Sequence, residues 1–110
     1  MIELRGYIDA TGKQRFAEWF EGLPATAAAK VVTALSRMEH GNFSNAKGVS
    51  DGIYEYRIDF GPGYRIYFGR DGDQIVILLG GRSKKRQSKD IQNAQACWQD
   101  YKQRKKRESH

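Results

Sequence analysis

Two kinds of hydrophobic periodicity follow one another along the chain and predict its secondary structure. Near the N-terminus, apolar residues recur every three or four positions, as on the buried face of a helix. Later segments alternate apolar and polar residues one by one, as strands do. The predicted elements, in chain order, are a strand over 2–8, a helix ending at Leu23, a helix over 25–39, strands over 54–60, 64–69 and 75–79, and a helix from residue 88. This β-α-α-β-β-β-α order predicts an α+β domain with a small antiparallel sheet and the helices packed on one of its faces.

Residues with capping or loop-forming roles set the expected boundaries of these elements. Asp9 and Thr11 are candidate N-caps of the first helix, because their side-chain oxygens can accept from free backbone N–H groups. The glycine-rich segment 41–52 is expected to be a loop, and Gly80-Gly81 is expected to end the preceding strand. That strand is apolar on both faces and should therefore lie in the middle of the sheet.

Composition limits the class of protein. With 110 residues, 39% of them hydrophobic and 29% charged, the chain is expected to form one globular domain over 1–101, followed by a basic tail over 102–110. The lone Cys97 cannot form an internal disulfide and is expected to pack in the last helix. The longest apolar stretch, 75–79, is too short to cross a bilayer, and the N-terminal residues lack a signal-peptide pattern. We therefore expect a cytoplasmic protein with no membrane association.

The net charge of +6 is concentrated at one end of the sequence. Residues 1–81 hold nine Lys and Arg against ten Asp and Glu, whereas residues 82–110 hold ten against three. A nearly neutral body with a basic last quarter favours a polyanionic partner, nucleic acid before membrane. A solvated basic tail that aids solubility explains the charge equally well.

The strongest candidate for chemistry is the polar face of the hairpin over 53–68. Alternation sends the tyrosines and other apolar residues to one face and leaves Glu55, Arg57, Asp59, Arg65 and Tyr67 on the other. A turn over 61–63 allows a register in which Arg57 and Arg65 share that face, where two guanidiniums could grip a phosphate. An ordinary exposed sheet face, with cross-strand ion pairs such as Glu55–Arg65, remains the alternative.

A second basic segment follows the last predicted strand. Five of the eight residues over 82–89 are basic: Arg82, Lys84, Lys85, Arg86 and Lys89. These donors and the N-terminus of the following helix could converge on an anion. A flexible solvated loop is the alternative.

Other common site chemistries are not indicated. His40 and His110 lie far apart with no partner pattern, so neither a metal site nor a nucleophilic triad is expected. The glycines at 61–63 and 80–81 lack the spacing and the lysine of a phosphate-binding loop. No cofactor is therefore expected.

The hairpin string from Gly52 to Phe68 resembles the signature of addiction-module killer proteins, the HigB-like members of the RelE/ParE toxin superfamily of toxin–antitoxin systems. Supporting similarity lies in three further segments: Phe16–Phe20 with Leu23, Met38–Asn42, and Ile77–Gly81 leading to Ile91, Ala94 and Trp98. The resemblance covers nearly the whole chain to Tyr101. It implies an antiparallel sheet flanked by two N-terminal helices and one C-terminal helix.

The resemblance also implies an activity and partners. RelE-like toxins cleave mRNA in the ribosomal A site without a metal, when the ribose 2′-hydroxyl attacks the adjacent phosphate, and a cognate antitoxin neutralises them. A helix-turn-helix antitoxin of the HigA type is implied here. By position, Arg65 would stabilise the phosphate, Arg57 would supply the basic residue of the preceding strand, and Arg82 or Lys84 the basic group after the last strand. Glu55 completes the candidate catalytic set, and Lys84, Lys85, Arg86, Lys89 and Tyr67 form the candidate RNA-binding set.

Three departures from the family pattern leave alternatives open. Glu55 stands where a lysine is expected, Arg82 stands where relatives carry an acidic residue, and the start of the last helix lacks the usual Tyr or His. The proton acceptor and donor are therefore unassigned. A ParE-like gyrase inhibitor that is not an enzyme, and a degenerate toxin that binds only antitoxin and DNA, are the alternative functions.

Overall fold

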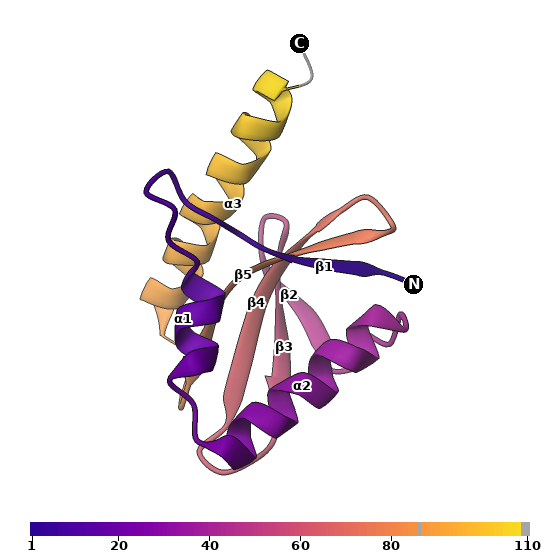
Figure 1. Cartoon of the computed structure of the whole chain (residues 1–110), viewed down its shortest axis with the longest axis vertical. Helices are drawn as coiled ribbons and strands as arrows, with labels where there is room; N and C mark the ends of the chain where they lie inside the picture. Colours follow the sequence, from indigo (N-terminus) through magenta and orange to yellow (C-terminus); the bar gives the residue numbers. More distant parts are fainter. Residues whose placement is uncertain (86, 109–110) are drawn as a thin grey trace.

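The computed structural model describes residues 1–85 and 87–108. It consists of a five-stranded sheet and three helices (Figure 1). In chain order the elements are β1 (Glu3–Gly6), α1 (Arg15–Glu21), α2 (Ala25–Glu39), β2 (Ala46–Ser50), β3 (Ile53–Ile58), β4 (Tyr64–Asp71), β5 (Ile75–Ser83) and α3 (Ser88–Glu108). The predicted α+β class is confirmed. One strand, β2, was not predicted. It lies inside the segment expected to be a loop, where it pairs with β3 although it contains a glycine.

The sheet has the order β1-β5-β4-β3-β2. Strands β2 to β5 form an antiparallel meander, and β1 returns to pair in parallel with β5. This arrangement places β5 inside the sheet, as its apolar sequence predicted. Residues on both faces of β5 are buried, since Val76 and Ile77 are 0% and 1% exposed.

The helices cover both faces of the sheet, so the prediction that they pack on one face was wrong. Figure 1 shows α2 crossing one face, while α3 lies against the other and projects beyond it. Apolar residues of α1 and α2, including Phe16 and Met38, pack against one face of the sheet. On the other face, Trp98 of α3 packs in a cluster with Ile53, Ile77 and Leu79. A sheet that carries apolar side chains on both faces needs a covering layer on each.

Two tryptophans lie so close to the sheet that the residues below them must lack side chains. A Cβ on Gly69 would lie 2.6 Å from the Trp98 ring, and a Cβ on Gly81 would lie 2.1 Å from the Trp19 ring. Trp19 also donates a hydrogen bond from Nε1 to Ser83 Oγ at 3.2 Å. The two rings thus fix α3 and α1, respectively, on the sheet.

Two local predictions differ from the structure. Asp9 does not cap α1: its Oδ1 accepts from the backbone N–H groups of Thr11 and Lys13, which closes a loop before the helix. Gly80-Gly81 does not end β5, which continues to Ser83 because Tyr67 still pairs with Gly80. Helix α3 runs on to Glu108, into the segment expected to be a basic tail.

Candidate functional site

Three arginines lie side by side across the sheet and form what we call the arginine row, Arg57, Arg65 and Arg82. Arg57 on β3 is opposite Arg65 on β4, as the hairpin pattern predicted, and Arg65 is opposite Arg82 on β5. Residues in such positions have Cβ atoms about 5 Å apart. Three cationic side chains therefore follow one line across three strands.

A bulge in β5 brings Arg82 into this row. Tyr67 pairs with Gly80 and Phe68 with Leu78, which leaves Leu79 as the extra residue. A bulge changes the face to which the following residues point. Without it, strict alternation from Ile77 would place Arg82 on the face covered by α2.

A second line of residues lies beside the arginine row, one pleat away on the same face. Lys47, Glu55, Tyr67 and Gly80 occupy it, from β2 to β5. Glu55 is only 1% exposed, and its Oε1 lies 3.6 Å from Nε of Arg65. The cross-strand ion pair expected from the sequence is confirmed; its carboxylate is buried and its guanidinium is partly buried, since the Arg65 side chain is 17% exposed.

Arg65 is also fixed from the opposite direction by the loop after β5. Its Nη1 donates a hydrogen bond to the carbonyl oxygen of Lys84 at 2.7 Å. The backbone N–H of Lys84 donates in turn to the carbonyl of Gly63, in the hairpin turn, at 2.8 Å. Lys84 adopts a φ of +79°, which a non-glycine residue rarely does. The loop is therefore fastened to the hairpin at the end of the arginine row.

Asp90 holds Arg82 and the start of α3 together. Its Oδ2 lies 3.5 Å from Nε of Arg82 and accepts a hydrogen bond from the backbone N–H of Gln87 at 3.0 Å. The second contact is the carboxylate half of a capping box, in which an acidic residue in the first turn satisfies the N–H before the helix. The sequence prediction missed Asp90 as a site residue, because the position before the helix holds Gln87 and not the Ser or Thr of the full motif.

Tyr67 contributes a buried hydroxyl next to Glu55. Its side chain is 2% exposed. Burial raises the pKa of Tyr67 far above its usual range, and the negative charge of Glu55 raises it further. The hydroxyl therefore remains protonated near neutral pH and can act as a hydrogen-bond donor.

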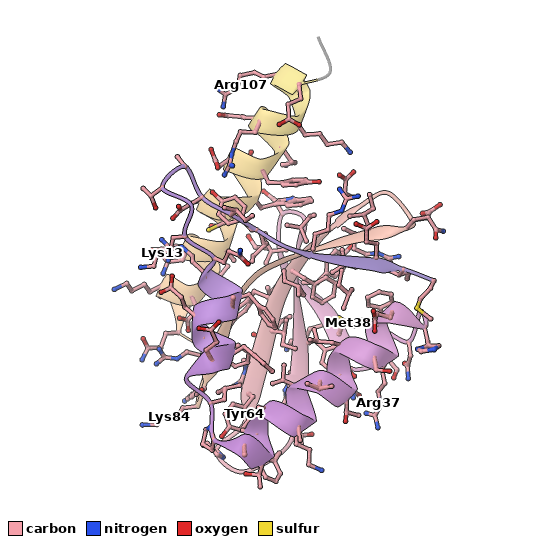
Figure 2. All side chains as sticks on the ribbon, viewed as in Figure 1. Lys13, Arg37, Met38, Tyr64, Lys84 and Arg107 are labelled. Carbon is pink, nitrogen blue, oxygen red and sulfur yellow. The ribbon has the colours of Figure 1, made fainter. Side chains whose placement is uncertain are left out.

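The other predicted site residues lie at the margin of this face. Lys84, Lys85 and Lys89 are exposed, and Figure 2 shows the Lys84 side chain pointing away from the sheet. Arg57, half exposed, lies 3.7 Å from Asp59. Arg86 lies outside the described residues.

Two hollows adjoin the arginine row. One, of about 320 Å³, lies at the hairpin turn and is lined by Arg57, Arg65 and the residues between them. The other, of about 240 Å³, lies between α1 and α3 and reaches Tyr67 and Gly80. The described residues contain no cluster of three His, Cys, Asp or Glu side chains that could hold a metal ion. None of the described helices is long and apolar enough to cross a membrane.

Comparison with known proteins identifies the family. Residues 18–102, which include β2 to β5 and most of α3, match the family described as phage-derived protein Gp49-like. The chain belongs to the Gp49-like family. It is also 42% identical over 86 residues to an uncharacterised protein of Haemophilus influenzae, covering 77% of this chain and 87% of that protein. The Gp49-like family is associated with toxins of toxin–antitoxin systems, so an antitoxin is the partner that the family indicates.

Proposed function

We propose that this Gp49-like protein is a toxin that cleaves messenger RNA in the ribosomal A site, without a metal, and that a HigA-like helix-turn-helix antitoxin neutralises it in the cytoplasm. The arginine row carries the proposal. Three arginines held in register on rigid strands suit the repeated phosphates of a nucleic-acid backbone. A protein that acted only by binding another protein would have no need of this arrangement.

The chemistry requires the site to bind and polarise one phosphate. The ribose 2′-oxygen attacks phosphorus, the bond from phosphorus to the 5′-oxygen breaks, and a 2′,3′-cyclic phosphate and a free 5′-hydroxyl result. Negative charge on the phosphate oxygens increases on the way to the transition state, and Arg65 and Arg82 stabilise it. Both guanidiniums are already oriented by other contacts, so little reorganisation is needed when the charge develops.

Glu55 and Tyr67 are both positioning residues in this proposal. Glu55 is buried beneath Arg65, so it acts as a positioning residue that orients the guanidinium rather than as a base that contacts RNA. Tyr67 is equally buried, and its protonated hydroxyl faces the Glu55 carboxylate, so it helps to hold that carboxylate in place beneath Arg65. The protons that leave the 2′-hydroxyl and reach the 5′-oxygen exchange with water. His40 cannot take them, because it follows α2 on the opposite face.

The rest of the basic surface would hold the RNA on either side. Lys84 and Lys85 extend the positive charge beyond Arg65, and Lys89 lies in the first turn of α3. Arg57 extends it toward β2. These residues belong to the binding surface, with Arg65 and Arg82 at its centre.

Induction of the protein in cells, followed by mapping of mRNA 5′ ends and of gyrase-dependent DNA breaks, tests the function. Cleavage within translated codons is expected. Double-strand DNA breaks with intact transcripts would instead support a ParE-like gyrase inhibitor and overturn the proposal. Growth arrest with neither effect would overturn it too.

A further inference from the structure

Gly80 has no side chain, yet nothing in the fold requires it to lack one. A Cβ built on Gly80 meets no atom within 4 Å. In contrast, a Cβ on its neighbour Gly81 would collide with Trp19. Gly80 therefore differs from Gly81 and Gly69, whose hydrogen atoms make room for the two tryptophans.

Backbone conformation does not explain Gly80 either. Its φ does not lie in the left-handed region, unlike that of turn glycines such as Gly61, Gly63 and Gly72. The bulge at Leu79 does not require a glycine either, since glycine is required only in bulges that contain a residue in the left-handed conformation. Glycine weakens a strand interior, and it often marks a place where a ligand approaches the backbone closely.

The space that Gly80 leaves open is the hollow between α1 and α3. Leu79, Gly80 and Gly81 form its floor, Tyr67 lies beside them, and α3 contributes Asn93. At about 240 Å³ it is smaller than the usual pocket for a drug-sized molecule, about 300 Å³ or more, and suits a single ring system. The hollow is lined by two basic residues, Lys13 and Arg15, and two acidic ones, Glu18 and Asp90, and Lys13 pairs with Glu18 at 3.7 Å. The hollow is therefore not an anion site like the arginine row.

The hollow and the arginine row are neighbours along the strands. Gly80 precedes Arg82 by two residues on β5, and Tyr67 follows Arg65 by two on β4. Two residues of strand span about 7 Å. A phosphate bound between Arg65 and Arg82 would thus lie next to the opening at Gly80.

We propose that this hollow binds one unstacked base of the messenger RNA, that of the nucleotide next to the phosphate held by Arg65 and Arg82. The inference rests on the proposed function and adds a base-reading site to it. A planar ring can lie against the peptide groups of Gly80 and Gly81, where any side chain on residue 80 would exclude it. The Asn93 amide offers a donor and an acceptor, the pair that recognises one edge of a base.

The test measures binding to ribosomes programmed with a 2′-O-methylated codon, which cannot be cleaved, and with the same codon made abasic at one position at a time. Gly80→Val fills the hollow without touching Arg65 or Arg82. Gly48→Val is the matched control, because Gly48 also has an ordinary φ and no atom within 4 Å of a built Cβ, but lies outside the hollow. The midpoint of urea unfolding of each variant shows whether it folds.

The wild-type protein and Gly48→Val should bind the intact codon roughly tenfold better than the codon abasic at one particular position, as expected for one bound base. Gly80→Val should lose this preference, yet bind the abasic codon as the wild type does. Equal binding of intact and abasic codons by the wild type would overturn the base site alone. A Gly80→Val variant that keeps the preference would also overturn it. So would a Gly80→Val variant that loses only antitoxin binding, because that result would mark the hollow as a protein interface. Failure of the wild type to bind programmed ribosomes at all would overturn the proposed function as well.

Discussion

Arg82 on β5 lies directly opposite Arg65 on β4, and the bulge at Leu79 brings it there. The pair is supported from two sides: Arg65 by Glu55 and the Lys84 carbonyl, Arg82 by Asp90. Because Asp90 also accepts from the N–H of Gln87, the start of α3 and the arginine row are coupled through one carboxylate. The site is therefore assembled from a hairpin, a bulged strand and a helix start.

The role of Glu55 separates positioning from proton transfer. We expect Glu55→Gln to lower the cleavage rate roughly tenfold while the pH–rate profile keeps its shape, because the amide still accepts from Arg65 but loses the ion pair. Single-turnover cleavage between pH 5 and 9 measures this. Loss of a limb of the profile would instead show that Glu55 is the general base.

Gly80 and Gly81 are expected to differ in their effect on stability. Gly81→Ala places a Cβ against the Trp19 ring, so it should lower the free energy of unfolding by about 2 kcal/mol, as overpacking does. Gly80→Ala should change it by less than about 0.5 kcal/mol, since the new Cβ meets open space. Urea unfolding measures both. Equal losses would mean that Gly80 is also fixed by packing.

Lys84 stores strain in the loop that holds Arg65. Lys84 has a φ of +79°. Replacement by glycine should remove the strain of this left-handed conformation, whereas replacement by alanine should retain the strain. We expect Lys84→Gly to be more stable than Lys84→Ala by about 1 kcal/mol, and neither variant carries the charge. Their midpoints in urea provide the comparison, and a more stable alanine variant would contradict this conformation.

Stability should fall at high pH because of buried tyrosines. Burial is the main cause that raises the pKa of Tyr67 far above its usual range and the pKa of Tyr7 to about 12. Above pH 10, therefore, both hydroxyls stay protonated in the folded protein while they ionise in the unfolded chain. The stability they provide is thus complete below pH 10 and is lost as pH rises above it, at up to about 1.4 kcal/mol per pH unit for each group. Denaturant unfolding between pH 9 and 11 should show a shallower decline for Tyr67→Phe than for the wild type.

The hairpin half of the site could be predicted from the sequence, and the β5 half could not. Strict alternation and a short turn determine the register, so Arg57 and Arg65 were correctly placed together. Arg82 shares their face because of one extra residue in β5, and no local signal marks Leu79 as bulged. The sequence Gly80-Gly81 predicts the end of a strand. In the structure, pairing of Gly80 with Tyr67 and packing of Trp19 over Gly81 keep both residues in the sheet. The packing of Trp98 over Gly69 accounts for α3 covering the second face.

The arginine row is tested most directly by cleavage of mRNA on purified ribosomes, with Arg65→Ala compared with Arg70→Ala. Arg70 lies on the same strand but contacts the ring of Phe43, on the face covered by α2, so it controls for loss of charge. The wild type and Arg70→Ala should cut within the codon in the A site and leave a 2′,3′-cyclic phosphate. Arg65→Ala should cut at least a hundredfold more slowly, as loss of one transition-state donor typically causes, while it still binds the antitoxin. Undiminished cleavage by Arg65→Ala, or intact mRNA with the wild type, would contradict the account.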